Sequence, residues 1–127
     1  MKLRIKGNSI RLRFSVNEIS ILKEQGSVAE ECVLSPSQTF SYGLTLSENL
    51  SDIRVHTSEN QMTVYLPKAT AQDWLTTDQV GIASTIENGV DEKLRILIEK
   101  DWQCMQPRTH EDESDLFPNP RLSEHEG

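Results

Sequence analysis

The first fourteen residues alternate charged and apolar side chains around the dipeptide Gly7-Asn8. Glycine at the first central position suits a two-residue type II′ turn, so the pattern predicts an antiparallel hairpin with Arg4 opposite Arg11. One face of this hairpin carries the apolar residues Leu3, Ile5, Ile10 and Leu12. The other face carries the basic residues Lys2, Arg4, Lys6, Arg11 and Arg13. Because a shift of one residue would mix the two sets, the register of this hairpin is strongly specified.

A helix is predicted over residues 16–25, directly after this hairpin. Ser15 is a suitable N-cap, Glu18 stands three residues later to complete a capping box, and Phe14 is placed to pack on Ile19. Gly26 then ends the helix.

The remaining elements follow from alternation and turn residues. We expect strands at 28–34 and 40–46, a hairpin at 51–66 around Glu59-Asn60, and a last pair of strands at 80–86 and 94–100. Residues 70–77 fit a short helix with Thr70 and Asp73 as a weak capping pair. We find no internal repeat with a period of roughly 20 to 50 residues.

Together these elements predict an α+β fold. We expect a mainly antiparallel sheet of about seven strands with one or two short helices. Strong curvature or partial closure into a barrel is expected, since it would protect the edge strands. Residues 1–106 would form a single domain, and residues 107–127, which are acidic and contain proline, a C-terminal tail that docks on it.

Composition sets the broad class of the protein. The 127 residues are 35% hydrophobic and 26% charged, which describes one globular domain. The two cysteines, Cys32 and Cys104, have no spacing typical of a disulfide scaffold. The N-terminal alternation does not resemble a signal peptide, and no stretch approaches the roughly 20 apolar residues of a membrane span. We therefore expect a cytoplasmic protein.

The charge of the chain is unevenly distributed. The net charge is −7, yet residues 1–14 contain five basic and no acidic side chains. Residues 101–127 contain seven acidic side chains against Arg108 and Arg121. A pI of about 4.9 argues against nucleic-acid binding, which normally requires a surplus of basic residues. We expect the two ends of the chain to attract each other.

The basic hairpin face is the candidate site. Like charges directly opposite each other on paired strands cost a few tenths of a kcal/mol to about 1 kcal/mol per pair, so a negative group must compensate them. Within the chain the candidates are Glu99 and Asp101, and the acidic group of the tail, Glu111, Asp112, Glu113 and Asp115. Outside the chain the candidate is an anion such as phosphate, which matches guanidinium geometry. The predicted anion-binding residues are Lys2, Arg4, Arg11, Arg13, Arg54 and Arg95.

If the sheet curled inward, His56 and Glu99 would join these residues in a shared groove. Such a groove would resemble the phosphate-binding tunnels of the CYTH family of triphosphatases and adenylate cyclases, whose strands carry Arg-x-Arg pairs like Arg11 and Arg13. The Glu-x-Glu-x-Lys start of that family is missing here, since residues 2–6 read KLRIK. Glu99 and Asp101 alone are a poor substitute for its metal-binding acids.

No other catalytic pattern is present. Cys104, His110 and Asp112 match neither the spacing of structural zinc sites nor a thiol motif. The chain has no glycine-rich phosphate loop, GxSxG elbow or HExxH pair. We therefore predict no catalytic residues, no metal and no cofactor. Cys32, within a strand, is expected to pack as a small apolar residue.

The opening MKLRIKGNSIRLRF, the later LRILIEKDWQC and the segment EDESDLFPNP together resemble a family of small bacterial proteins known as a domain of unknown function. The corresponding positions are residues 2–13, 99–104 and 111–120. This resemblance implies a bacterial source and that the FPNP segment belongs to the domain. It implies no activity.

Two hypotheses about function follow. In the first, the protein is a non-enzymatic interaction domain whose acidic tail lies over the basic hairpin face, leaving another surface for a protein partner. In the second, the same face is a phosphate-ester or nucleotide pocket that is comparable with a triphosphatase site.

Overall fold

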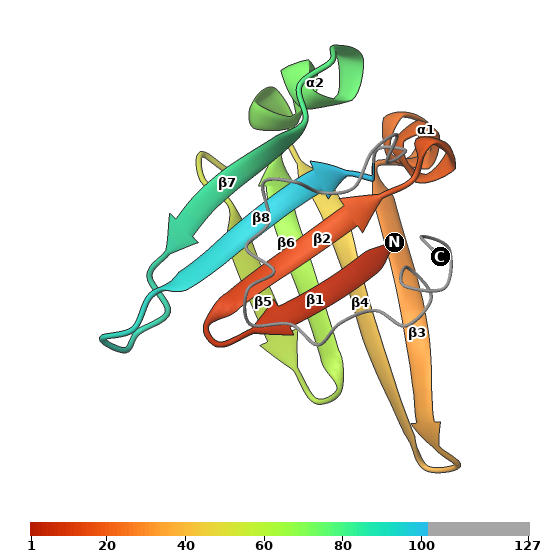
Figure 1. The fold of residues 1–127 in the computed structure, drawn as a ribbon, viewed down its shortest axis with the longest axis vertical. Helices are drawn as coiled ribbons and strands as arrows, with labels where there is room; N and C mark the ends of the chain where they lie inside the picture. Colours follow the sequence, from red (N-terminus) through yellow and green to blue (C-terminus); the bar gives the residue numbers. More distant parts are fainter. Residues whose placement is uncertain (102–127) are drawn as a thin grey trace, which may run out of the picture.

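The structure is a computed structural model that describes residues 1–101. It contains eight strands and two helices (Figure 1). The strands are β1 (Lys2–Lys6), β2 (Ser9–Phe14), β3 (Ser27–Ser35), β4 (Gln38–Ser47), β5 (Arg54–Ser58), β6 (Gln61–Pro67), β7 (Gly81–Ile86) and β8 (Leu94–Lys100). The helices are α1 (Val16–Gln25) and α2 (Lys68–Thr76). The expected tail at 107–127 lies outside the described residues.

The strands form two mixed sheets of four, in the orders β1-β2-β8-β7 and β3-β4-β6-β5. Each sheet consists of two antiparallel hairpins joined by a central parallel pair, β2 with β8 and β4 with β6. The α+β class is therefore confirmed. The expected single, mainly antiparallel and barrel-like sheet is wrong, because the hairpins associate in two separate open sheets instead of one continuous sheet.

The two halves of the chain repeat the same order of elements, strand-strand-helix-strand-strand. The starts of β1 and β5, of β2 and β6, and of α1 and α2 are separated by the same interval along the chain. That interval also relates the following pairs of buried residues: Ile10 and Met62, Leu12 and Val64, Phe14 and Leu66, Ile19 and Ala71, Leu22 and Trp74. Each half contributes one hairpin to each sheet, so neither half has a complete sheet of its own.

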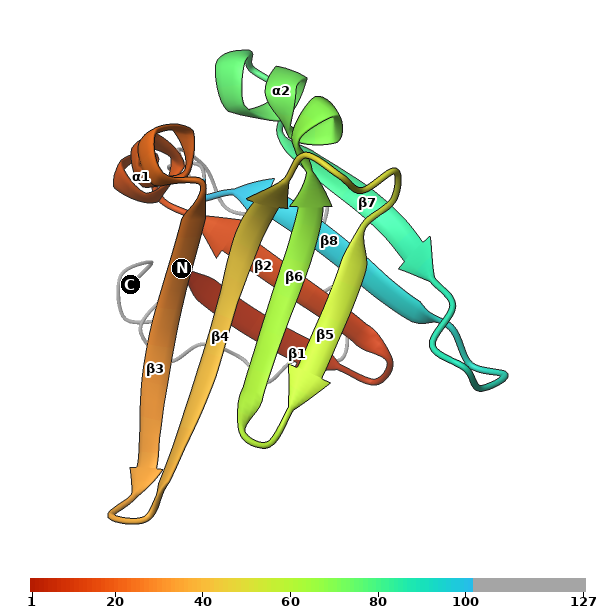
Figure 2. The same cartoon turned by 180° about the vertical axis from the view of Figure 1, so that it is seen from behind.

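One hydrophobic core joins the two sheets and both helices. The sheets lie face to face with their strands crossing, and both helices lie at the same end (Figures 1 and 2). The helices connect the layers, since α1 follows β2 of one sheet and precedes β3 of the other. The largest fully buried side chain is Trp74 of α2, which meets Phe14 of β2 edge to face.

Local predictions agree closely with the structure in the first half. The β1-β2 hairpin has the predicted register, with Arg4 opposite Arg11. Gly7 has a φ of 54°, the left-handed value that a side chain disfavours. Helix α1 covers the predicted residues, and its capping box is complete: the Ser15 hydroxyl accepts from the Glu18 amide while the Glu18 carboxylate accepts from the Ser15 amide.

Helix α2 differs from its prediction. It begins at Lys68, its N-cap is Pro67, and no side chain caps its first turn. The expected capping pair of Thr70 and Asp73 is therefore wrong. The buried residues Ala71, Trp74 and Leu75 decide the position of this helix, because tertiary packing outweighs a weak local cap.

Neither helix in residues 1–101 combines the length and apolar character needed to cross a membrane.

Candidate anion-binding face

The outer side of the sheet β1-β2-β8-β7 carries most of the predicted site residues. The hairpin register places the side chains of Lys2, Arg4, Lys6, Arg11 and Arg13 on this side, because their neighbours in sequence include the buried Ile10, Leu12 and Phe14. The parallel pairing of β2 with β8 aligns Ser9 with Arg95, which adds Arg95 to the same side. We call these six basic residues the basic face.

Two acidic residues of the chain compensate part of this charge. The Arg11 Nε donates to Glu99 Oε1 at 2.5 Å, and the Arg13 Nε lies 3.4 Å from the same oxygen. Lys2 Nζ lies 2.8 Å from Asp101 Oδ2. The Glu99 side chain is 16% exposed and that of Arg13 18%, so these partners interact in a partly desolvated environment. Glu99 and Asp101 are the intrachain counter-ions predicted from the sequence.

Three members of the basic face have no such partner within residues 1–101. Arg4, Lys6 and Arg95 form no ion pair with any described residue. Arg4 and Lys6 are exposed, and Arg4 lies opposite the half-buried Arg11. The described part of the molecule therefore leaves a surplus of positive charge at one end of the hairpin.

The structure does not bring Arg54 to the basic face. Arg54 and His56 lie on β5, at the edge of the other sheet. Arg54 lines a different pocket, of about 600 Å³, together with Asp52 and residues 84–87 that begin in β7. The groove shared by Arg54, His56 and the hairpin arginines was predicted from an inward-curling sheet, and it is absent from the described residues because the two sheets stay open.

A second polar cluster lies where β1 of one sheet meets β3 of the other. The α-amino group of Met1 donates to both Glu18 and Glu30. Glu30 also accepts from the Tyr42 hydroxyl at 3.2 Å. Sequence reasoning assigned Glu18 to the helix cap alone and missed this cluster, because its members come from the N-terminal residue and three elements, α1, β3 and β4, that meet only in the folded molecule.

The cluster shifts the acidity of its members. Burial alone would lower the pKa of the Met1 amine, but its hydrogen bonds to Glu18 and Glu30 raise that pKa above its ordinary value. For Glu18, burial opposes ionisation, yet the bonds from the Met1 amine and Ser15 lower its pKa. Burial, with a smaller effect of Glu30, raises the pKa of Tyr42. The cluster therefore favours the charged forms of the Met1 amine and Glu18, which connect the start of the chain to helix α1.

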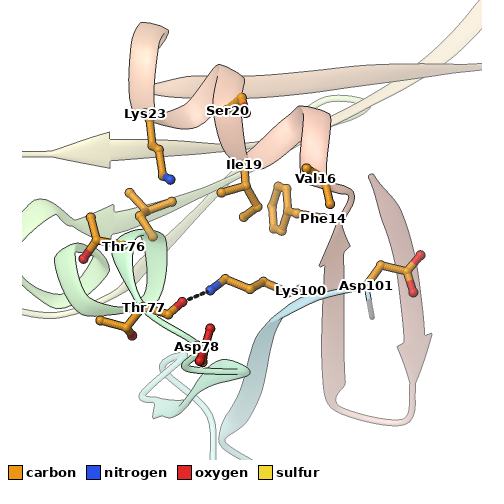
Figure 3. A pocket seen from close by; sticks show the side chains of 11 residues that line it. Phe14, Val16, Ile19, Ser20, Lys23, Thr76, Thr77, Asp78, Lys100 and Asp101 are labelled. Atoms are coloured by element: carbon orange, nitrogen blue, oxygen red, sulfur yellow. Dashed lines mark hydrogen bonds between the residues drawn. The ribbon is translucent and has the colours of Figure 1, made fainter. Parts of the chain in front are cut away.

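A pocket of about 330 Å³ lies between the two helices and the end of β8 (Figure 3). Phe14 and Ile19 form part of its apolar surface, and the Lys100 Nζ donates to the Thr77 carbonyl at 2.5 Å. Two lysines and two aspartates line it: Lys23, Lys100, Asp78 and Asp101. Because these charges balance, the pocket has no net charge with which to select an anion, unlike the basic face.

Other predicted features are placed as follows. Cys32 lies within β3 as expected, but it is exposed, so its predicted burial is wrong. Its end of the β3-β4 hairpin extends beyond the other sheet (Figure 2), and the neighbouring Val33 and Leu34 are exposed as well.

In residues 1–101 no group of His, Cys, Asp and Glu is arranged to hold a metal. Cys104, His110 and Asp112 lie outside the described residues.

Comparison with known proteins agrees with the resemblance at the two ends of the sequence. Residues 1–121 match a family of unknown function (DUF7009). The chain belongs to this family. No curated protein and no solved structure matches it. The match covers the two sheets and both helices and extends through the FPNP segment, so DUF7009 membership describes almost the whole chain and assigns no specific activity.

Proposed function

We propose that this DUF7009 protein is a small, cytoplasmic, non-enzymatic binding domain whose basic face holds an acidic polypeptide segment. The observation that carries the proposal is the incomplete compensation of the basic face. Glu99 serves two arginines at once, while Arg4, Lys6 and Arg95 have no acidic partner within residues 1–101. Paired strands with like charges opposite each other are stabilised when a negative group is added.

The acidic segment that best fits is the chain's own, at Glu111, Asp112, Glu113 and Asp115. Asp101 contacts Lys2 at the start of β1, so the chain leaves β8 beside the basic face. Ten further residues reach at most about 35 Å, whereas a five-residue strand is about 17 Å long. These acids can therefore reach every basic residue of the hairpin.

Neutralisation of these acids tests the proposal in the full chain. The quadruple variant Glu111→Gln, Asp112→Asn, Glu113→Gln and Asp115→Asn should lower the melting temperature by a few degrees at low salt. The difference should shrink at 0.5 M NaCl, since salt screens exposed ion pairs. The matched control is Glu124→Gln with Glu126→Gln, which should have little effect. Equal melting temperatures for the quadruple variant and the parent chain at low salt would contradict the proposal.

A small anion is the second candidate for the same face. It is favoured by the register that sets Arg4 opposite Arg11, because adjacent guanidinium groups match the oxygens of a phosphate. Inorganic phosphate, triphosphate and nucleotides would then raise the melting temperature in proportion to the logarithm of their concentration. Arg4→Glu should abolish this gain, and Arg54→Glu, on the other sheet, should not. If none of these anions shifts the transition, the phosphate-ester hypothesis fails.

A further inference from the structure

Because neither sheet closes, the described fold has four edge strands: β1, β7, β3 and β5. Edge strands present unpaired backbone groups, and proteins commonly protect them with charged side chains or irregularities. Strand β1 carries Lys2, Arg4 and Lys6, and β5 carries Arg54 and His56. Strand β3 carries Glu30 and Glu31 and has a register shift near its end.

Strand β7 has none of these protections. Its sequence, GIASTI, contains no charged residue and no proline. Within residues 1–101 it pairs with β8 on one side and with no strand on the other. Both views of the fold place β7 at the outer margin of the molecule (Figures 1 and 2).

The register with β8 identifies the unpaired backbone groups of β7. The Lys100 amide donates to the Val80 carbonyl, so the alternating residues Val80, Ile82, Ser84 and Ile86 direct their backbone groups toward β8. Gly81, Ala83 and Thr85 direct theirs toward the free edge. The Gly81 carbonyl accepts from the Gln79 side chain, and the backbone groups of Ala83 and Thr85 have no partner among the described residues.

These outward groups are arranged symmetrically about Ala83. An antiparallel pair of β7 strands centred there would set Ala83 opposite its equivalent and Gly81 opposite Thr85, with both amide-carbonyl bonds formed at each pair. Glu87 would lie opposite Gln79, so no two acidic side chains would meet. Val80, which is 52% exposed, would lie opposite the partly buried Ile86, and this contact would bury apolar surface of Val80 that is now exposed to water.

We propose that two copies of the chain associate through β7, with the two β7 strands antiparallel and two-fold symmetric about Ala83. The β1-β2-β8-β7 sheets of the two copies would then form one continuous sheet. A two-fold interface uses the same patch on both subunits, which the symmetric edge of β7 satisfies. The second copy fits better than an unrelated strand because its charges and its Val80-Ile86 contacts match in this register. This inference does not depend on the proposed function of the basic face.

Engineered cysteines test the register directly. In a full chain carrying Cys32→Ser and Cys104→Ser, Ala83→Cys should form an intermolecular disulfide under mild oxidation, since Cα atoms of a directly opposed pair lie about 5.5 Å apart. Thr85→Cys is the matched control, because in this register two copies of residue 85 lie roughly 14 Å apart, too far for a disulfide. A monomeric Ala83→Cys protein, or equal cross-linking of both variants, would overturn the proposal.

Sedimentation velocity of the unmodified chain provides a second test. The sedimentation coefficient should rise with protein concentration as dimers form. Ala83→Lys should weaken association at least tenfold, because two lysines would meet at the centre of the interface. Ser58→Lys, on the edge strand β5, should leave it unchanged, and circular dichroism should show both variants folded. A parent chain that stays monomeric up to about 1 mM, the upper end of weak association, would refute the interface.

Discussion

Phe14 and Trp74 meet edge to face, with ring centroids 5.7 Å apart and an interplanar angle of 76°. Phe14 ends β2 in the first half of the chain, and Trp74 belongs to α2 in the second. The Trp74 indole also donates to the Val80 carbonyl at 3.2 Å, just before β7. The Trp74 side chain therefore connects the end of β2, helix α2 and the residue before β7.

Trp74→Phe should lower the free energy of unfolding by about 1–3 kcal/mol. The change removes the hydrogen bond to Val80 and leaves a cavity beside Phe14 in the core. Urea denaturation measures the effect. Gln72→Ala, at an exposed position of the same helix, should change the unfolding free energy by less than about 0.5 kcal/mol.

Glu99→Gln should destabilise the protein by about 1–3 kcal/mol at low salt, because Arg11 and Arg13 would lose their shared counter-ion. The loss should be smaller at 0.5 M NaCl. Glu87→Gln is the comparison, since the Glu87-Lys93 pair is exposed and such pairs contribute little. Equal effects of the two substitutions at low salt would show that Glu99 does not compensate the basic face.

The Met1-Glu18 ion pair should make the free energy of unfolding fall at both low and high pH. The pKa of Glu18 is lowered by folding, so its contribution is present above the ordinary value of about 4.3 and is lost as the pH falls through the folded value. The pKa of the Met1 amine is raised, so its contribution is present below about 8 and is lost as the pH rises through the folded value.

Thermal melting from pH 3 to pH 10 measures both effects. Glu18→Gln should flatten the acidic limb of the profile most, whereas Glu24→Gln, an exposed glutamate of the same helix, should leave it unchanged. An unchanged acidic limb in Glu18→Gln would assign the loss to other carboxylates.

Gly43→Ala should destabilise the protein by about 1–3 kcal/mol. A Cβ at this position of β4 would lie 2.7 Å from the Val28 carbonyl oxygen and 3.0 Å from the Ala29 Cβ, so the β3-β4 pair would have to separate. Ser41→Ala, two residues earlier on the same face, is the control in the urea measurement. Loss of stability in Gly43→Ala equal to that in Ser41→Ala would show that the pair adjusts without cost.

The polar cluster around Met1 illustrates why some tertiary contacts escaped prediction. A regular hairpin closed at Ser35 and Gln38 would set Glu30 opposite Gly43. The register shift between Val33 and Ser35 instead sets Glu30 opposite Tyr42, which creates the hydrogen bond between them. No local turn signal specifies that shift, so the contact could not be deduced from alternation alone.

The sequence by itself determined the local units of this protein. The alternation around Gly7-Asn8, the capping box of Ser15 and Glu18, and the facing of Arg11 with Arg4 depend on contacts between residues close along the chain, which propensity and turn chemistry specify. It also identified Glu99 and Asp101 as counter-ions by charge.

Only the tertiary structure decided how these units assemble. The pairing of β2 with β8 joins residues more than eighty positions apart, and the placement of β5 in the other sheet separates Arg54 from the hairpin arginines. The structural repeat was hidden because equivalent positions share burial and apolar character but not residue identity or size, as Ile19 and Ala71 or Leu22 and Trp74 show. Association of hairpins depends on how complementary apolar faces fill one common core, a property of the whole molecule that no segment contains.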